Sequence, residues 1–389
     1  MMLIDGPYVS DFLKSTLHQK QIEVIETPIA MELLGEGYNY ISEEDALERL
    51  QANGQSRIFS NSENSIAWVE RNLSFSNTPE KVNTFKDKVK FRQLLKSTYP
   101  DYFFKSVALE ELDLVDIDAL PVPFVIKPAV GFFSMGVYNV YRRDEWPDVQ
   151  HAIKREVESV KGLYPKEVMD ATTFIIEQHI KGEEYAVDCY FADSGEPVVL
   201  NIMHHLFSSG KDVSDRVYIT SQKIIQQYKP VFENFLDQLG QLAGLKNFLI
   251  HIEIRVDDDG QIIPIEVNPM RFGGWCTTAD LTWHAYGFNS YEYFNEGKRP
   301  DWKQIFREHT DDLFSVIVLD NGSGIPGKDV HSFDYDQMLS GFQKPLELRK
   351  VNFKKFPLFG FVFAQTLDGN MKELFRILHS DLKEFIRKK

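Results

Sequence analysis

The sequence lacks several features that would assign it to a specialised class of protein. It has only two cysteines, Cys189 and Cys276, which are too far apart to form a metal-binding motif. No apolar run approaches the roughly 18 residues of a membrane span, and the first residues show no basic-then-apolar signal pattern. We therefore expect a cytoplasmic protein with two free, buried thiols, although a disulfide is compatible with the sequence.

Positive charge is also scarce. The chain has 43 Lys and Arg residues against 58 Asp and Glu residues, which gives a net charge of −15 at pH 7. Affinity for nucleic-acid backbones and for anionic membranes comes largely from Lys and Arg. The composition therefore argues against both as partners, but it leaves room for a small anionic ligand bound by a local basic cluster.

The length and the order of apolar segments predict an α/β protein with more than one domain. A chain of 389 residues is too long for one simple core. Short strand and helix candidates alternate over residues 1–85 and again after about residue 311, which is typical of α/β layers. Residues 228–245 read as an amphipathic helix, and residues 370–389 read as a final one.

The most informative stretch is residues 248–274, FLIHIEIRVDDDGQIIPIEVNPMRFGG, which predicts a β-hairpin. Charged and aliphatic residues alternate on both sides of Asp259-Gly260, the preferred pair for a two-residue turn. Counting outward from that turn places Glu253 opposite Glu266. Like charges directly opposed across two strands are destabilising. The two glutamates therefore need a proton, a basic neighbour or a metal ion.

Asn268 lies on the same face of the predicted hairpin as Glu266, opposite His251. Two carboxylates and an amide oxygen suit a hard cation such as Mg²⁺, which usually shares its oxygen ligands with phosphate. Arg271 follows, and the glycines after it allow a ligand to approach while its planar fork binds a carboxylate or phosphate. The alternatives are a surface hairpin with solvated glutamates and an arginine that only bridges two elements.

Three segments upstream of the hairpin are consistent with an anion or nucleotide site. Lys88 lies near the start of a basic helix, where backbone N–H groups also favour an anion. Lys127 ends an apolar strand and precedes a glycine-containing loop over residues 131–136. Glu177 and Glu184 flank a short connector whose backbone could read an adenine while a carboxylate holds a ribose. The alternatives are a solvated helix face and two ordinary hairpins.

Taken in chain order, these residues resemble the ATP-grasp superfamily of carboxylate–amine ligases, over about residues 80 to 300. The most specific part is the spacing of Glu253, Glu266, Asn268-Pro269 and Arg271. Within the superfamily, residues 271–275, RFGGW, are most similar to the Arg-Phe-x-Gly-Trp segment of L-amino-acid (dipeptide) ligases. The loop GFFSMG has fewer glycines than many relatives, and Met270 places Arg271 one position later than the common Asn-Pro-Arg pattern.

The resemblance implies an ATP-grasp fold of the α/β (α+β) class, in which two antiparallel-sheet subdomains hold the nucleotide. A Rossmann-like pre-ATP-grasp domain would occupy residues 1–85. The small subdomain with the phosphate loop would span residues 86–185, and the large subdomain with the metal site would span residues 186–310. Residues 311–389 would form a C-terminal α/β part.

The resemblance also implies a role for each candidate residue. The lysines and the loop would bind the phosphates, the connector would read the adenine, and Glu184 would bind the ribose. These nucleotide-binding positions are Lys88, Lys127, Gly131, Ser134, Gly136, Glu177, Gln178, Ile180 and Glu184. Mg²⁺, or Mn²⁺ in its place, would be carried by Glu253, Glu266 and Asn268. The catalytic positions would be Lys127 and Arg271, with Arg271 stabilising the transferring phosphoryl group and Trp275 lining an amino-acid pocket.

The activity implied by the resemblance is that of an ADP-forming ligase. ATP would phosphorylate a small carboxylate, in particular that of an amino acid, and an amine would attack the acyl phosphate. An ATP-grasp kinase or thiol ligase, and a non-catalytic ATP-binding regulatory module, are the alternatives. The sequence names neither the carboxylate nor the amine, and it leaves a homodimer, which is common in the family, open.

Overall fold

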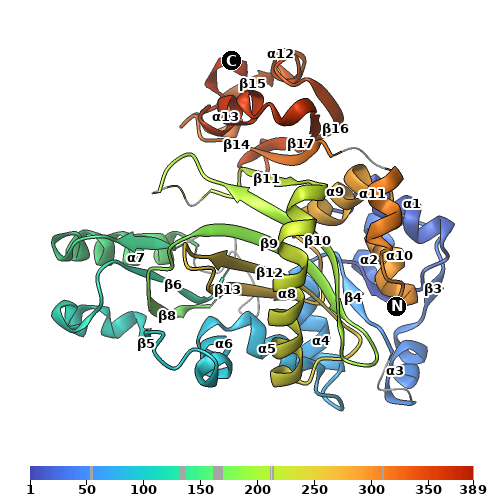
Figure 1. Cartoon of the computed structure of the whole chain (residues 1–389), viewed down its shortest axis with the longest axis horizontal. Coiled ribbons are helices and arrows are strands. Elements are labelled where there is room, and N and C mark those ends of the chain that lie inside the picture. The colour runs from blue at the N-terminus through green and yellow to red at the C-terminus, as the bar shows by residue number, and fades with distance from the viewer. Residues whose placement is uncertain are drawn as a thin grey trace.

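The computed structural model of the protein describes residues 1–52, 56–131, 136–160, 170–210, 212, 214–308 and 311–388. Its largest sheet crosses the centre of the molecule, with the amino-terminal unit on one side and a smaller antiparallel sheet on the other (Figure 1). The last strands lie at the end of the large sheet, at the top of the view. The candidate site lies where these units meet.

The chain begins with a small α/β unit, as the alternation of short elements predicts. Its parallel sheet has the order β3-β2-β1-β4, from β1 (Met2–Leu3), β2 (Val24–Ile25), β3 (Tyr40–Ile41) and β4 (Phe59–Ser60). The helices of the unit are α1 (Asp11–Gln19), α2 (Pro28–Leu34), α3 (Glu43–Ala52) and α4 (Ile66–Asn72). Ser10 and Thr27 begin α1 and α2 by accepting backbone N–H groups with their hydroxyl oxygens.

Two helices lead from this unit into the smaller sheet. They are α5 (Thr78–Lys86) and α6 (Lys88–Leu94), and Asp87 caps α6 through the backbone N–H groups of Val89 and Lys90. The antiparallel sheet has the order β5-β8-β6-β7, from β5 (Phe104–Ala108), β6 (Phe124–Val130), β7 (Tyr138–Val140) and β8 (Asp170–Gln178). Helix α7 (Trp146–Val160) covers it, with Trp146 packed edge-on against Phe124.

The large sheet is antiparallel throughout, in the order β13-β12-β9-β10-β11-β14-β17-β16. Its first strands are β9 (Glu183–Phe191), β10 (Pro197–Leu206), β11 (Val217–Thr220), β12 (Phe248–Val256) and β13 (Ile262–Pro269). Three later strands extend it: β14 (Leu313–Asp320), β16 (Lys344–Lys350) and β17 (Leu358–Thr366). The segment after residue 311 therefore shares a sheet with the candidate site.

Helices cover the large sheet. Helix α8 (Gln222–Ala243) contacts β10 and ends at Gly244, which has a left-handed backbone (φ 60°). After the hairpin come α9 (Thr277–Tyr286), α10 (Ser290–Glu296) and α11 (Trp302–Glu308). The predicted helix over residues 228–245 is thus confirmed, but it begins six residues earlier, at the cap provided by Ser221.

The predicted final helix over residues 370–389 is wrong. Helix α13 covers only Lys372–Leu378, and Leu382 then takes a left-handed backbone (φ 61°) that ends the helical path. The chain continues as β18 (Ile386–Lys388), which pairs antiparallel with β15 (Val330–Phe333) next to α12 (Tyr335–Leu339). The basic end of the chain therefore lies along an exposed strand, where Ile386 supplies the buried contact.

Two expectations about the chain as a whole can be compared with the structure. Cys189 and Cys276 are both free and buried, as predicted. No helix in the described part of the chain is both long and apolar enough to cross a membrane.

Gly240 makes a close approach possible between α8 and the large sheet. A Cβ atom at this position would lie 2.4 Å from the ring of Phe191, which is completely buried. Glycine to alanine within a helix normally stabilises by up to about 1 kcal/mol. We expect Gly240→Ala instead to destabilise by about 1–3 kcal/mol, because the overpacked ring cannot move aside.

Urea unfolding of Gly240→Ala measures this effect. The matched control is Gln226→Ala, an exposed position on the same helix, for which a change within about 0.5 kcal/mol is expected. A Gly240→Ala protein as stable as the wild type would show that the helix and sheet are not in such close contact.

Candidate active site

The predicted hairpin is present as β12 and β13 at one edge of the large sheet, and Glu253 lies opposite Glu266 as predicted. The predicted two-residue turn is wrong, because Val256 pairs with Ile262 and the N–H of Asp257 donates to the carbonyl oxygen of Gln261, which leaves three residues in the turn. A register shift next to Glu253 compensates for the extra loop residue. The glutamate pairing therefore depends on a bulge that the sequence pattern did not reveal.

His251 lies opposite Asn268, also as predicted, and both are buried. Nδ1 of His251 lies 2.8 Å from Oδ1 of Asp188, and Nε2 lies 3.9 Å from Oε1 of Glu253. Asp188 is completely buried on β9, and its Oδ2 has no hydrogen-bond partner within the described residues. Asp188 thus orients the imidazole, with its second nitrogen turned toward Glu253.

The environment shifts the pKa values of the two glutamates in opposite directions. Burial acts to raise the pKa of Glu266, but Lys88, 2.8 Å away, and then Lys127 outweigh it and lower the pKa to about 2. Burial, followed by the negative charge of Glu266, raises the pKa of Glu253 well above its ordinary value. A cation bound between the two carboxylates would relieve this repulsion.

These residues fit a magnesium ion that also binds phosphate. Two carboxylates and the Asn268 side chain offer oxygen ligands, and Mg²⁺ commonly takes one or two protein carboxylates together with phosphate oxygens and water. The described part of the chain has no cluster of three or more His, Cys, Asp or Glu side chains suited to holding a metal by themselves. The donor set thus matches a cation that arrives with a phosphate ligand.

Both predicted phosphate-binding lysines point into this region from other elements. Lys88 at the start of α6 has its Nζ 3.4 Å from the carbonyl oxygen of Gly131, in addition to its ion pair with Glu266. Lys127 on β6 lies 2.6 Å from Oε1 of Glu177. Burial lowers the pKa of Lys127, whereas the pKa of Lys88 is raised because its acidic neighbours outweigh burial.

Glu177 is clamped between two cations. Its Oε2 lies 2.7 Å from Nε of Arg92, and its Oε1 holds Lys127. Arg92 also donates from Nη1 to the carbonyl oxygen of Pro264 on β13, at 2.6 Å. The side chain of Glu177 therefore positions Lys127 and ties the small sheet to α6, while only its backbone remains for the predicted reading of an adenine.

The connector after β8 joins the two sheets, so the alternative of an ordinary hairpin is wrong for this segment. Strand β8 belongs to the small sheet and β9 to the large one. The carbonyl oxygen of Gln178 accepts from the Tyr102 hydroxyl at 3.2 Å, and that of Ile180 accepts from Nη1 of Arg255 at 2.6 Å. The residues predicted to bind the adenine thus lie at the connection between the two sheets.

Glu184, the predicted ribose ligand, lies at the start of β9 and is buried. Its carboxylate binds Nδ1 of His205 at 2.8 Å and Nε of Arg255 at 2.9 Å. Burial acts to raise the pKa of Glu184, but His205 and Arg255 outweigh it and lower the pKa. His205 is buried, whereas its neighbour His204 on the opposite face of the strand pairs with the exposed Glu183.

Two glycines of the predicted phosphate loop are described, whereas Ser134 lies outside the described residues. The carbonyl oxygen of Gly131 lies 3.4–3.5 Å from the ammonium groups of Lys86 and Lys88. Gly136 has a left-handed backbone (φ 72°), and its N–H donates to Oε1 of Glu156 on α7 at 3.1 Å. Gly131 therefore lies beside the lysines, whereas Gly136 is held against α7.

Arg271 makes the bridge between elements that the sequence analysis gave as its alternative role. Its Nε donates to Oε1 of Glu63 at 3.0 Å, its Nη2 pairs with the same carboxylate, and its Nη1 donates to the carbonyl oxygen of Phe272. Lys86 binds the other oxygen of Glu63. Burial acts to raise the pKa of Glu63, but Arg271 and Lys86 lower it to about 2.

Trp275, predicted to line an amino-acid pocket, is packed among aromatic rings. It stacks on Tyr8 with a centroid distance of 5.6 Å and meets Phe356 edge-on at 5.1 Å. Trp275 and Cys276 both have left-handed backbones, with φ of 57° and 60°. Such strain in residues other than glycine is often found at functional sites.

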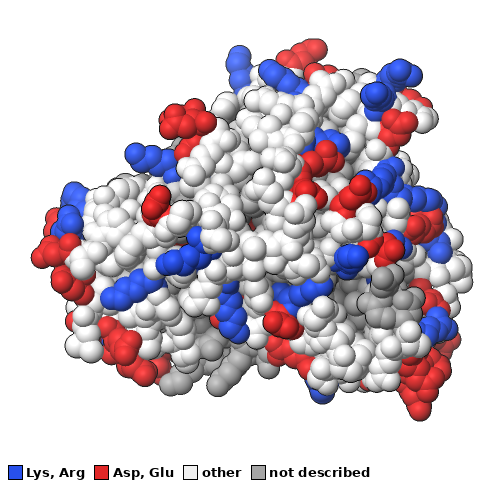
Figure 2. All heavy atoms as spheres, turned by 60° about the horizontal axis from the view of Figure 1, so that its bottom comes forward, with Lys and Arg blue, Asp and Glu red and all other residues white. Residues whose placement is uncertain are grey.

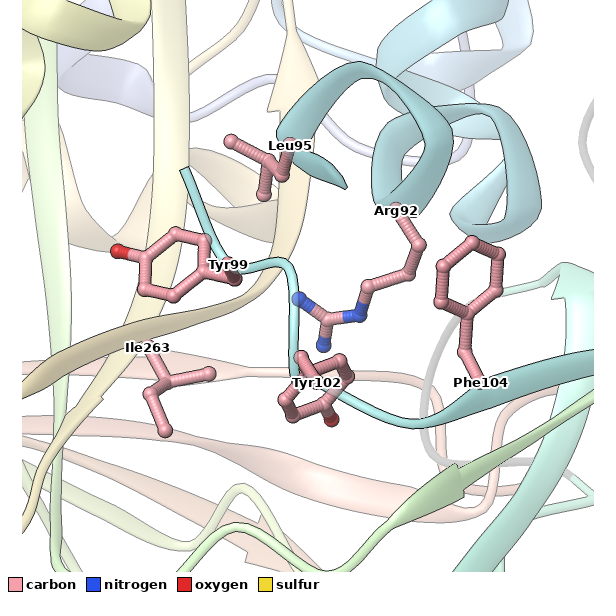
Figure 3. Close-up of a pocket in the computed structure, with 6 residues that line it drawn as sticks. All are labelled: Arg92, Leu95, Tyr99, Tyr102, Phe104 and Ile263. Carbon is pink, nitrogen blue, oxygen red and sulfur yellow. The ribbon is translucent and has the colours of Figure 1, made fainter. Parts of the chain in front are cut away.

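A pocket lies beside the Arg92 side chain, between α6 and β13 (Figure 3). Its lining residues are Arg92, Leu95, Tyr99, Tyr102, Phe104 and Ile263. The Arg92 guanidinium lies 4.5 Å from the centre of the Tyr102 ring, a cation–π contact. The pocket belongs to the packing that fixes Arg92 rather than to the face that carries the glutamate pair.

The sequence analysis missed three residues that hold the side chains of the site: Glu63, Asp188 and Arg92. Glu63 lies in a Ser- and Asn-rich segment with no periodic signal, so nothing in the sequence connected it with Arg271. Asp188 did have a signal, because it interrupts the apolar strand EYAVDCYF. Arg92 had one as well, since it follows Lys88 by four residues on the same helix face.

Part of the sequence is similar to known proteins. Residues 120–279 match the family model for the ATP-grasp domain. A D-alanine–D-alanine ligase from Anaplasma centrale is 31% identical over 99 residues, which cover 25% of this chain and 41% of that ligase. Residues 120–279 are therefore similar to an ATP-grasp domain.

Solved structures extend the similarity to the whole chain. The L-amino acid ligase from Bacillus licheniformis has a TM-score of 0.68 at 17% identity, over 100% of this chain and 98% of that one. The biotin carboxylase domain dimer of Hydrogenobacter thermophilus 2-oxoglutarate carboxylase, in complex with MgADP, ADP and bicarbonate, has a TM-score of 0.59 at 10% identity, over 94% and 86%. The predicted ATP-grasp fold is confirmed.

The clamp on Glu177 predicts a pH dependence of stability. The pKa of Glu177 is about 2, below its ordinary value of 4.5, so its ionised form stabilises the fold above about pH 4.5 and this contribution is lost as the pH falls toward 2. We expect Glu177→Gln to lose about 3–5 kcal/mol at pH 7, because Arg92 and Lys127 remain buried without their counter-charge. Its urea midpoint should also fall less than the wild-type midpoint between about pH 5 and pH 2.

Glu183→Gln is the matched control, since Glu183 is exposed and pairs only at the surface with His204. It should change stability by no more than about 0.5–1 kcal/mol. Equal stability and equal pH profiles for Glu177→Gln and the wild type would contradict the clamp.

Proposed function

We propose that the protein is an ATP-dependent, ADP-forming ligase that joins a small carboxylate to an amine through an acyl phosphate. The observation that supports this most is the Glu253–Glu266 pair, set beside Lys88 and near Lys127 in an ATP-grasp fold. Phosphoryl transfer to a carboxylate brings several negative charges together, so positioned cations supply most of the catalysis. The site offers that combination.

For the nucleotide, we propose that Lys88 and Lys127 exchange their glutamate partners for phosphate oxygens. The connector residues Glu177, Gln178 and Ile180 would bind the adenine through their backbone, and Glu184 would bind the ribose. The loop from Gly131 through Ser134 to Gly136 would cover the phosphates. The neighbour structure with MgADP supports a nucleotide with magnesium in this fold.

For the metal, we propose that Glu253, Glu266 and Asn268 hold Mg²⁺, or Mn²⁺ in its place. The ion would neutralise phosphate charge and align the oxygens for transfer. Lys88 would turn from Glu266 to phosphate, and Asp188 would keep His251 facing Glu253. Arg271 would then stabilise the charge of the phosphoryl group and of the acyl phosphate.

For the substrates, we propose an amino acid as the carboxylate, supported by the similarity in fold to the L-amino acid ligase. Its partners would be small molecules, with neither nucleic acid nor membrane involved. On the face shown in Figure 2, basic and acidic side chains are interspersed. A homodimer remains a proposal, supported by the dimer among the neighbours.

We also keep the division into parts at residues 1–85, 86–185, 186–310 and 311–389 as a proposal. The first two parts each contain their own sheet. The second part also includes the start of β9, which belongs to the large sheet. The third and fourth parts share the large sheet, so they are expected to unfold together.

Phosphate release from Mg-ATP in the presence of amino acids and amines tests the proposed function. Glu266→Ala should lower kcat/KM by at least about 100-fold, because it removes a metal ligand and leaves Lys88 without its partner. Removal of divalent cations with EDTA should abolish release by the wild type, and added Mg²⁺ should restore it.

The control variant is Glu196→Ala, whose carboxylate pairs with Arg299 at the surface and should leave kcat/KM within about twofold. Tight ATP binding without substrate-dependent phosphate release would favour a regulatory module instead. Full activity of Glu266→Ala would contradict the metal assignment.

A further inference from the structure

A buried acid–base pair connects the amino-terminal unit with the candidate active site. Glu63 and Arg271 are 208 residues apart in sequence, yet their side chains pair, and neither is more than 10% exposed. Directly before them, the backbone N–H of Ser60 on β4 donates to the carbonyl oxygen of Met270 at 2.8 Å. The segment that carries Glu63 is therefore fixed to the segment that carries Arg271.

The two oxygens of Glu63 have different partners. Oε1 binds Arg271, while Oε2 binds Lys86, which also lies 3.5 Å from the carbonyl oxygen of Gly131 at the phosphate loop. If Arg271 turns to a ligand, Glu63 keeps Lys86 but loses its partner on Oε1. Breaking a buried pair without replacing the lost partner is costly.

This arrangement distinguishes between two kinds of carboxylate ligand. A ligand with only a carboxylate can replace Glu63 on Arg271, but it leaves Oε1 of Glu63 buried and unpaired. A ligand that also carries an ammonium group replaces both halves of the pair and leaves the net charge of the site unchanged. An α-amino acid has these two groups on one carbon.

We propose that Glu63 selects an α-amino acid as the carboxylate substrate, by accepting its ammonium group while Arg271 binds its carboxylate. The amino acid inserts between the two side chains, and Glu63 keeps Lys86 on its second oxygen. This inference rests on the proposed ligase function and adds the residue that reads the amino group. In the absence of substrate, the Glu63–Arg271 contact keeps both charges paired.

The same pair could serve only to hold the amino-terminal unit in place. A purely structural pair would stay closed during turnover, so its loss would affect all carboxylate substrates equally. A pair that opens for an amino acid would affect only substrates with an amino group. The ratio of activities toward two matched substrates therefore separates the two roles.

The test compares L-amino acids with their deamino analogues, such as L-alanine with propionate and L-leucine with 4-methylpentanoate. Phosphate release from Mg-ATP gives kcat/KM for each acid, with hydroxylamine present as a common acceptor. In the wild type, the amino acid that supports the fastest release should exceed its deamino analogue by about 100-fold or more, because the analogue leaves a buried group unpaired. In Glu63→Gln, this ratio should fall to within about tenfold, mostly through loss of activity with the amino acid.

Glu63→Asp keeps the charge and should restore part of the ratio. Because Glu63→Gln leaves two buried cations, the double variant Glu63→Gln/Lys86→Met, which removes one charge of each sign, is measured alongside it and should show the same loss of discrimination. Glu23→Gln is the matched control in the same unit, since Glu23 pairs with Arg49 at the surface, and it should keep the wild-type ratio.

Three results would overturn the inference. Equal kcat/KM for amino acids and deamino analogues in the wild type would leave the ligase standing but remove amino-group selection. An unchanged ratio in the Glu63 variants would make the pair structural. Phosphate release with no acid at all would overturn the proposed function, and this inference with it.

Discussion

The constraint on which the site depends is the repulsion between Glu253 and Glu266 across two paired strands. The hairpin forces the carboxylates together, and burial makes their shared negative charge costly. In the structure, Lys88 binds Glu266, and the pKa of Glu253 is raised. A cation bound to both glutamates would relieve their repulsion and would free Lys88 to bind an anion.

The charges around this pair come from several elements between Glu63 and Arg271. Five basic side chains converge there: Lys86, Lys88, Arg92, Lys127 and Arg271. They face the carboxylates of Glu63, Glu177 and Glu266, whose pKa values are lowered, and that of Glu253, whose pKa is raised. A protein with a net charge of −15 thus gathers five buried basic side chains at one site, which suits a polyphosphate.

Local rules predicted the parts of the site that lie within one element. Alternation along residues 248–268 gave the shared face of Glu253 and Glu266, and the cap of α6 placed Lys88 at a helix start. The α/β class followed from the order of short elements. The family resemblance then connected residues from Lys88 to Arg271 into one nucleotide site, which no local pattern could do.

Contacts between distant elements were beyond sequence reasoning. Nothing local marks Glu63 as the partner of Arg271, and the assignment of β8 and β9 to different sheets depends on pairing with strands far along the chain. The bulge beside Glu253 offsets the longer turn, and no pattern in the sequence indicates it. The predicted last helix failed because its apolar positions also fit a short helix and a strand, and pairing with β15 decided between them.

A crystal structure with Mg²⁺ and a non-hydrolysable ATP analogue tests the central claim most directly. The account predicts that Lys88 and Lys127 leave Glu266 and Glu177 for phosphate oxygens, and that Glu253, Glu266 and Asn268 bind the metal between the two sheets. A nucleotide bound elsewhere, or one bound here with both lysine–glutamate pairs intact and no metal on the glutamates, would contradict it.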